Sequence, residues 1–443
     1  MSGSSKVIEN AICTFCGCVC DDIELTVDSG GKHITQAKNA CVLGKAWFLE
    51  HKVEDFPVAL IDGKEASLEE AVDAAAEVFV NAKFPTIYGL SDTTCEAQKQ
   101  AVAIADYLNG NIDTTTSVCH GPTGMAFQGV GESTASLGEI KNRADFVMYW
   151  GGNPAEAHPR HFERYAVNPK SPWMPNGKED RTIAMVDIRP TQSSMIADIF
   201  LQIKPGSDFE LLWAMRALVK GRALDRSVEE RTGISLDRLE ALVQQMKDCQ
   251  FGVLFFGMGL TMTRGRHFNA GALLQLVTDL NDFTHFVSMP TRGHGNVTGA
   301  DNVVAWQTGY NFGVNFNRGY PRFNPGEFTT ADVLGRGEAD ALCVIASDPA
   351  SNFSAKAIEH IKSIPVITLD PKPTVTSQHA KVAFTTATYG INVPGTVYRM
   401  DNVPLSLRPA FDSPFPSDEK VLRAIKERIC ELRGITPNHK PAA

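Results

Sequence analysis

Short, nearly continuous apolar runs alternate with amphipathic stretches along most of the chain after residue 55. The runs predict β-strands, because each is short and nearly continuous in apolar residues. They are PTIYGL (85–90), DFVMYWGG (145–152), TIAMVDI (182–188), FGVLFFG (251–257), ALCVIAS (341–347) and PVITLD (365–370). Between them, SLEEAVDAAAEVFVNA (67–82) and DFELLWAMRALVKG (208–221) predict helices. Apolar strands that alternate with helices indicate an α/β protein with parallel sheets covered on both faces, in which ligands bind beyond the carboxyl ends of the strands.

Two of these strand ends carry the same residues. When VDIRPTQSSMIAD (186–198) is aligned with LDPKPTVTSQHAK (369–381), Asp187, Pro190, Thr191, Ser194 and Ala197 match Asp370, Pro373, Thr374, Ser377 and Ala380, and Arg189 meets Lys372. In both copies the preceding strand ends in a polar residue followed by proline, at Asn153 and Asp348. Chance is the alternative, since such turns are common at strand ends. We favour two related domains whose turns bind a nucleotide-like ligand through backbone N–H groups.

A third turn, GMGLTMTRG (257–265), opens a helix after a strand. By itself, this pair of glycines is weak evidence for a phosphate-binding loop.

Five of the ten cysteines lie within the first 41 residues, in CTFCGCVC (13–20) and NACVLGKA (39–46). Cys13, Cys16, Cys20 and Cys41 have the spacing C-x2-C-x3-C-x20-C, and three thiolates on one loop with a fourth further along are typical of a [4Fe–4S] cluster. A structural zinc site is the alternative, although such sites tend to contain two C-x2-C pairs and the second pair is missing here. We interpret Cys18 as a bystander.

The overall charge and hydropathy exclude several classes of partner. A net charge of −9 and a pI near 5.7 argue against binding to nucleic acid or to an anionic membrane. The longest apolar run, FGVLFFGMGL (251–260), is far too short to span a bilayer. The N-terminus has no apolar signal sequence, so we expect a cytoplasmic protein.

Three further stretches, together with the cysteine loop and the repeated turns, resemble the molybdopterin oxidoreductase superfamily. SVCHGPTG (117–124) is similar to the segment that supplies the metal's protein ligand in the formate-converting branch. PTRGHGNVTGADN (290–302) resembles the loop of that branch whose arginine faces the substrate, and LQIKPGSDFELLWAMRAL (201–218) resembles a pterin-contacting segment. Within the superfamily, the opening CTFCGCVCDDIEL (13–25) looks most like the family of B subunits of formylmethanofuran dehydrogenases.

The resemblance implies a small N-terminal iron–sulfur domain followed by two related parallel-sheet α/β domains that bind pterin dinucleotides, without the C-terminal barrel domain of full-length formate dehydrogenases. We place the iron–sulfur domain at residues 1–55. One pterin-binding domain would be discontinuous, at 56–125 and 300–443, and the other would span 126–299. The capping barrel domain would then belong to a separate subunit.

The resemblance also assigns chemistry to individual residues. Cys119 would ligate tungsten or molybdenum beside two molybdopterin guanine dinucleotides, His120 would transfer a proton, and Arg292 would hold formate or CO2 by a charge-assisted contact that lysine could not duplicate. A relay lysine is common two residues after the fourth cluster cysteine; here that position is Leu43, and Lys45 follows. The expected pterin contacts are Asn153, His158, Asp187, Arg189, Thr191, Gly206, Asp208, Gly257, Met258, Gly259, Gly293, Asn296, Asp348 and Asp370.

The function implied is the catalytic step of formylmethanofuran dehydrogenase, the two-electron reduction of CO2 to formate that begins methanogenesis from CO2. Electrons would arrive from iron–sulfur subunits, and formate would pass to an amidohydrolase-type subunit that binds methanofuran. The alternatives are a cofactor-free structural subunit of a formyltransferase/hydrolase complex and a formate dehydrogenase with another electron acceptor. A Cys119–His120 hydrolase is disfavoured, because adjacent residues rarely face each other and no third orienting group is evident.

Overall fold

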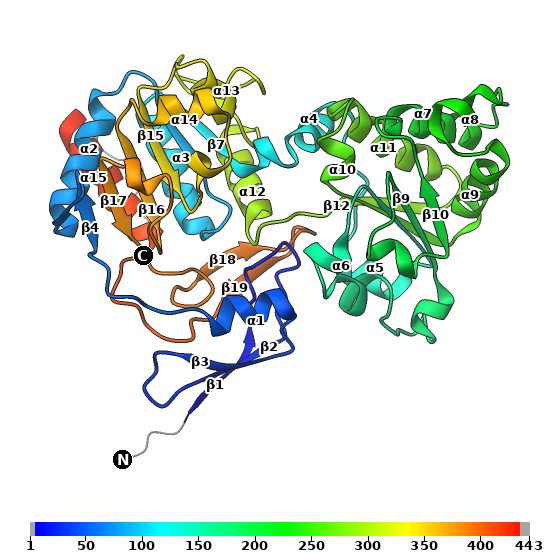
Figure 1. The fold of residues 1–443 in the computed structure, drawn as a ribbon, viewed down its shortest axis with the longest axis horizontal. Coiled ribbons are helices and arrows are strands. Elements are labelled where there is room, and N and C mark those ends of the chain that lie inside the picture. Colours follow the sequence, from blue (N-terminus) through cyan, green and yellow to red (C-terminus); the bar gives the residue numbers. More distant parts are fainter. Residues whose placement is uncertain (1–4, 435–443) are drawn as a thin grey trace.

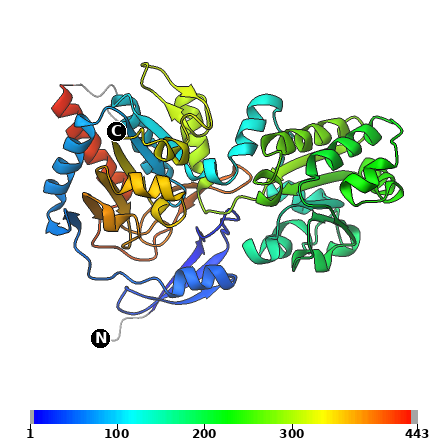
Figure 2. The ribbon, with the colours of Figure 1, turned by 45° about the horizontal axis from the view of Figure 1, so that its top comes forward.

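Two α/β lobes and a small cysteine-rich module make up the described chain (Figure 1). The computed structural model describes residues 5–434, so the outermost residues of the predicted segments 1–55 and 300–443 lie outside the described residues. In the turned view the module lies under the first lobe and beside the lower part of the second lobe (Figure 2). None of the helices among the described residues is both long enough and apolar enough to cross a bilayer.

The first lobe contains a nine-stranded mixed sheet. Its strands are, in spatial order, β14 (Arg322–Phe323), β13 (Val314–Asn315), β7 (Asn111–Thr114), β6 (Pro85–Gly89), β15 (Ala341–Ile345), β16 (Val366–Asp370), β17 (Val382–Thr385), β4 (Ala59–Ile61) and β5 (Lys64–Ala66). One face packs on α2 (Leu68–Asn81), α3 (Cys95–Tyr107), α12 (Val297–Thr308) and α15 (Asp418–Arg433). The other face packs on α13 (Thr330–Gly335) and α14 (Ala355–Ile361).

The second lobe contains a five-stranded parallel sheet. Its spatial order is β10 (Ile199–Gln202), β9 (Thr182–Asp187), β8 (Phe146–Trp150), β11 (Phe251–Phe256) and β12 (His285–Pro290). One face packs on α7 (Asp208–Val219), α8 (Ser227–Thr232), α9 (Leu236–Asp248) and α11 (His267–Leu280). The opposite face shares one hydrophobic core with α5 (Leu137–Arg143) and the cysteine-rich module.

The cysteine-rich module is a three-stranded antiparallel sheet followed by one helix. It comprises β1 (Lys6–Ala11), β2 (Ile23–Val27), β3 (Ile34–Lys38) and α1 (Val42–Leu49). The hairpin β18 (Gly395–Tyr398) and β19 (Pro404–Leu407) packs against its cysteine loop through a small apolar cluster that contains Ile12, Val397 and Leu407. The module therefore contacts a late segment of the chain as well as the second lobe.

The six predicted strands and the two predicted helices are confirmed, and the central strands of both sheets are parallel. Alternate residues of β15 enter different cores: Cys343 and Ile345 face one, and Leu342 and Val344 face the other. Burial on both faces is the reason that the run is apolar throughout. At the edges, however, β4, β5, β13 and β14 pair antiparallel, so the large sheet is mixed rather than purely parallel.

The start of α2 illustrates how local sequence sets an element. Ser67 accepts a hydrogen bond from the backbone N–H of Glu70, and the Glu70 carboxylate accepts one from the backbone N–H of Ser67. This capping box satisfies two N–H groups that the first turn of a helix leaves without intrahelical partners.

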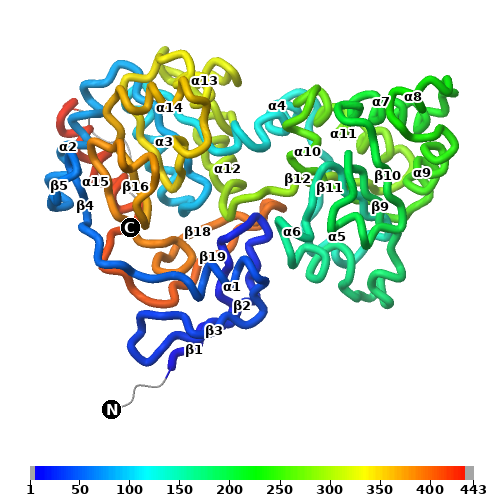
Figure 3. Tube along the Cα trace, viewed as in Figure 1, coloured from blue at the N-terminus to red at the C-terminus, as the bar shows by residue number. Residues whose placement is uncertain are grey.

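The chain crosses between the lobes at two places that matter for the site. It leaves β7 through a short 3-10 helix (Thr115–Val118) and enters α4 (Gly121–Val130), which packs on α11. It returns from β12 through residues 291–296 into α12 of the first lobe. Both crossings run through the middle of the molecule in the tube view (Figure 3).

Candidate functional site

The five N-terminal cysteines line one small cavity between the module and the second lobe. Besides Cys13, Cys16, Cys18, Cys20 and Cys41, its wall includes His158, Pro159 and Arg160. Cys13 and Cys20 are joined by a backbone hydrogen bond of 2.9 Å, which closes the loop tightly. Among residues 5–434, no three Cys, His, Asp or Glu side chains are spaced to hold a single metal ion. The argument for an iron–sulfur cluster therefore rests on the cavity that the five cysteines share.

Gly44, in the first turn of α1, brings two of these sulfurs together. Its backbone N–H donates to Cys41 Sγ at 3.4 Å, and a Cβ atom built on it would lie 3.1 Å from Cys13 Sγ. Burial raises the pKa of Cys13 well above its usual value and that of Cys20 to about 11. Buried thiols that share a cavity and receive a backbone N–H bond fit the ligand set of an iron–sulfur cluster, whose binding would displace their protons.

Cys18 forms a hydrogen bond with one of the predicted ligands. Its thiol hydrogen-bonds to Cys16, which raises the pKa of Cys18 and lowers that of Cys16. Cys18 lines the same cavity as the other four cysteines, so its assignment as a bystander stays a prediction. Lys45 lies exposed on α1, and Leu43 is half-buried.

Cys119 and His120 occupy the first crossing between the lobes. Cys119 ends the 3-10 helix, with its N–H donating to Thr116 O at 3.0 Å, and remains half-buried. His120 is fully buried, its Nδ1 lies 3.1 Å from Thr123 Oγ1, and its Nε2 has no hydrogen-bond partner within the described residues. Burial, together with the positive charge of Arg292, lowers the pKa of His120 to about 3. The low pKa favours the neutral imidazole, and the predicted role of His120 in proton transfer stays a prediction.

Arg292 occupies the second crossing and is almost fully buried. Its Nη2 donates to Thr116 Oγ1 at 2.7 Å and to Asp301, while its Nε is buried without a partner among residues 5–434. Burial raises the pKa of the Cys119 thiol, and the Arg292 charge opposes this rise. Cys119, His120 and Arg292 are thus brought together as the sequence predicts, with two orphaned polar atoms, His120 Nε2 and Arg292 Nε. Buried polar groups normally have partners, so these atoms fit a bound ligand or cofactor.

The Arg292 loop also touches the cysteine loop. Cys16 forms an isolated β-bridge with His294, and Gly17 N donates to Gly293 O at 3.3 Å. A ring nitrogen of His158, Nε2, lies 2.7 Å from Arg292 O, and His158 also lines the cysteine cavity. The predicted cluster site and the predicted substrate arginine are therefore neighbours across one layer of backbone.

The two repeated turns have the same hydrogen bonds. In the first, Thr191 N donates to Ser194 Oγ at 2.9 Å and Ser194 N donates to Thr191 Oγ1 at 3.2 Å. In the second, Thr374 and Ser377 form the same reciprocal pair, at 2.8 and 3.0 Å. The two turns are therefore alike in their side-chain hydrogen bonds as well as in their residues.

The polar residue before each proline anchors its turn in both copies. Asn153 Oδ1 accepts from Ser193 Oγ at 2.6 Å, and Asp348 Oδ1 accepts from Thr376 Oγ1 at 2.6 Å. These two predicted pterin contacts are therefore occupied in holding the turns, and so is Thr191. Burial raises the pKa of Asp370 to about 7. Its carboxylate accepts the N–H of Lys372 at 3.2 Å, and its counterpart Asp187 accepts the N–H of the next residue at 2.7 Å. Arg189 is exposed.

Several other predicted contacts are engaged in packing. Asn296 accepts from Tyr398 N and donates to Thr93 O, both at 2.7 Å, and Asp208 accepts from Trp150 Nε1 at 2.8 Å. A Cβ atom on Gly257 or Gly259 would lie 2.5 or 2.7 Å from Gly151 O, so these glycines permit close backbone packing.

Of the remaining predicted contacts, Gly293 and Met258 are open, whereas Gly206 lies beside Arg264. Gly206 has a φ of +78°, which favours glycine. A Cβ atom built on Gly293 would meet no other atom within 4 Å, and Met258 is exposed. Sequence reasoning missed Thr116 and Asp301, which contact Arg292 directly.

Two solved structures share this fold. A chain of the formyltransferase/hydrolase complex from Methylorubrum extorquens, solved in complex with methylofuran, gives a TM-score of 0.69 at 21% identity over 85% of this chain and 99% of that one. Acetylene hydratase from Pelobacter acetylenicus gives 0.72 at 13% identity over 95% and 69%. Identities this low establish the fold alone. The chain shares the mixed α/β fold of these two structures, with a cysteine-rich module, the half-buried Cys119, and the buried His120 and Arg292 where its lobes meet.

The sequence comparisons identify the family within that class. No protein-family model matches the chain. A protein from Methanocaldococcus jannaschii is 43% identical over 96% of this chain and 99% of its own length, and one from Methanococcus maripaludis is 40% identical over 97% and 100%. Both are named as B subunits of tungsten-containing formylmethanofuran dehydrogenase 2. The chain belongs to the family of formylmethanofuran dehydrogenase B subunits, and it is an oxidoreductase.

Proposed function

We propose that this chain is the catalytic subunit that reduces CO2 to formate in a formylmethanofuran dehydrogenase complex. In this reaction CO2 accepts two electrons and one proton. The observation that carries the proposal is the meeting of Cys119, His120 and Arg292 at the crossings between the lobes, with one buried nitrogen of His120 and one of Arg292 lacking partners among the described residues. The tungsten-containing relatives, which match this chain over nearly their whole length, support the same interpretation.

Cys119 would hold tungsten or molybdenum carried by two pterin guanine dinucleotides, and the bound metal would supply the two-electron redox chemistry. The repeated turns would bind the two dinucleotides mainly through backbone N–H groups, because their Thr, Ser, Asn and Asp side chains are occupied in the turns. Cys13, Cys16, Cys20 and Cys41 would hold the [4Fe–4S] cluster.

Arg292 would orient the carboxylate of formate, or CO2, through its uncommitted Nε, since a guanidinium in a buried site binds planar anions strongly. His120, whose buried Nε2 has no partner among the described residues, would accept the proton released on formate oxidation and return it on CO2 reduction.

The chain would work in a multi-subunit complex. We propose an amidohydrolase-type subunit that binds methanofuran and receives formate, a separate subunit that supplies the pterin-capping domain, and iron–sulfur subunits that deliver electrons. The likeness to a chain of a formyltransferase/hydrolase complex supports assembly of this kind.

Metal and cofactor analysis of the native complex, purified without oxygen, tests the proposal. We expect about four irons, one tungsten or molybdenum, and two guanine dinucleotides for each copy of this chain. Cys119→Ser should lower formate turnover to background while the iron content stays unchanged. An intact complex that lacks all three components would instead identify a structural subunit, and one that transfers electrons from formate without forming formylmethanofuran would identify a formate dehydrogenase.

A further inference from the structure

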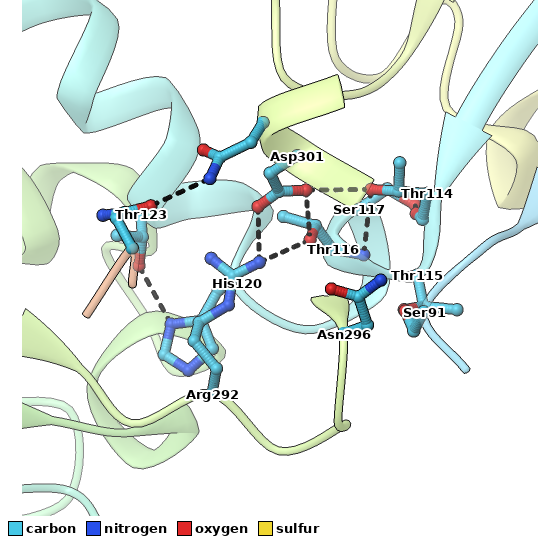
Figure 4. Close-up of polar contacts among 12 residues, drawn as sticks. Ser91, Thr114, Thr115, Thr116, Ser117, His120, Thr123, Arg292, Asn296 and Asp301 are labelled. Carbon is cyan, nitrogen blue, oxygen red and sulfur yellow. Dashed lines mark hydrogen bonds and ion pairs between the residues drawn. The ribbon is translucent and has the colours of Figure 1, made fainter. Parts of the chain in front are cut away.

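A buried carboxylate contacts the guanidinium of Arg292. Asp301, in the second turn of α12, forms an ion pair with Arg292 Nη2, and its other oxygen accepts from Thr116 Oγ1 at 2.7 Å and from Thr114 Oγ1 at 3.2 Å (Figure 4). Arg292 and Asp301 expose only 5% and 8% of their surfaces. A buried carboxylate whose two oxygens accept from three donors has a fixed orientation, because any other orientation of the carboxylate would leave a buried donor without a partner.

The same network fixes the orientation of Arg292. Thr116 accepts from Arg292 Nη2 while donating to Asp301, so guanidinium, hydroxyl and carboxylate form a closed triangle. The triangle engages one nitrogen of the guanidinium and leaves Nε buried without a partner among the described residues. Thr116 lies three residues before Cys119, so the triangle also joins the arginine to the turn that carries the cysteine.

We propose that Asp301 is the positioning residue that holds Arg292 in register with Cys119, so that its uncommitted Nε faces the planar carboxylate of formate. The inference rests on the proposed function, because it assigns the anion that Arg292 receives. Asp301 also balances the arginine charge, so that an anion enters a site that is close to neutral before it binds. Loss of this carboxylate leaves the guanidinium buried, uncompensated and free to rotate toward another acceptor.

A second buried pair in the same chain serves as a matched control. Asp279 on α11 pairs with Arg216 on α7 and with the more exposed Lys220, each at 2.8 Å, and the Asp279 side chain is also about one-tenth exposed. This pair packs inside the second lobe and touches none of Cys119, His120 or Arg292. Asp279→Asn therefore removes a comparable carboxylate from a comparable arginine outside the site.

The experiment compares the whole complexes that carry Asp301→Asn and Asp279→Asn with the wild type. Formate oxidation is measured with a low-potential one-electron dye, formate binding by calorimetry, and iron, tungsten and molybdenum by mass spectrometry. For Asp301→Asn we expect unchanged metal content and a rise of about tenfold or more in the formate KM and Kd, because the lost contact positions a charge-assisted bond. Asp279→Asn should lower the unfolding midpoint without changing the KM.

A double-mutant cycle separates positioning from general destabilisation. Arg292→Lys should weaken formate binding, and Asp301→Asn added to it should cost little more, since Asp301 acts through the guanidinium. Thr116→Val, which removes the hydroxyl of the triangle, should also raise the formate KM. This variant provides the test if Asp301→Asn fails to fold. A KM unchanged in both single variants, or full additivity with Arg292→Lys, would overturn the inference alone. A wild-type complex that neither binds nor oxidises formate would overturn the proposed function and the inference with it.

Discussion

The contact between the cysteine loop and the Arg292 loop can be tested by one added methyl group. Gly17 packs against the backbone of Arg292, and a Cβ atom at Gly17 would lie 2.3 Å from Arg292 O. The backbone of Gly17 is outside the left-handed region, so alanine is sterically allowed there except for this contact. Ordinary van der Waals contact begins at 3.4 Å, so the loops must separate by about 1 Å (3.4 − 2.3).

We expect Gly17→Ala to reduce both activity and stability. Overpacking of this kind costs about 1–3 kcal/mol, and misplacement of a catalytic group by about 1 Å can lower the rate by about 100-fold. The Arg292 carbonyl cannot simply turn away, because a ring nitrogen of His158 lies 2.7 Å from it. Formate oxidation by the complex should fall by about 10- to 100-fold, and the unfolding midpoint should fall by a few degrees.

Gly271→Ala on α11 is the matched control, since no atom lies within 4 Å of a Cβ built there. Alanine in place of this half-buried glycine in a helix interior should stabilise the helix by up to about 1 kcal/mol and leave turnover unchanged. If Gly17→Ala keeps its activity within about twofold and its unfolding midpoint, the two loops are not packed as described, and the link between cluster site and substrate arginine fails with it.

Two further predictions concern the buried His161 and the cysteine cavity. Burial lowers the pKa of His161 to about 3, below its value of about 6.5 in the unfolded chain, so the unfolded chain binds a proton first as the pH falls. The free energy of unfolding should therefore be full above pH 6.5 and smaller by about 2 kcal/mol at pH 5. His161→Phe should therefore show a shallower loss of unfolding midpoint between pH 7 and pH 5 than the wild type, and an equal slope would contradict the assignment. Cys41→Ser should remove most of the iron, while Cys18→Ala should retain about four irons per chain by mass spectrometry; equal iron loss in both would make Cys18 a ligand.

The central strands were predictable because they are buried on both faces. Runs such as those of β11 and β15 contain almost no polar residue, and the structure places every residue of both runs in a core. The edge strand β14 and its neighbour β13 have two residues each, too few to show any periodicity. Their antiparallel pairing depends on long-range contacts, which local sequence does not encode.

Within the site, the reliable signals were spacing and repetition. The cysteine spacing placed all four predicted ligands at one cavity, and the matched residues around Thr191 and Thr374 form matching turns. The roles of single polar side chains were less predictable. Asn296 and Asp208 sit in motifs that suggest ligand contacts, yet their polar atoms bind the protein itself.

Asp301 could not be found from its sequence context. An aspartate near the start of a helix usually faces solvent, where it interacts with the helix dipole. Its partners are Arg292, nine residues earlier in a loop, and two threonines about 185 residues away, Thr114 and Thr116. Only the crossing of the chain between the lobes brings these segments together.

The position of the site at the two crossings constrains how the lobes can move. Cys119 and His120 lie on the segment that leaves the first lobe, and Arg292 lies on the segment that returns to it. A rotation of one lobe against the other would normally change the distance between two such segments. Here the Arg292–Asp301–Thr116 triangle ties the returning segment to the leaving one, so Arg292 is joined to the segment that carries Cys119 and His120 as well as to its own lobe.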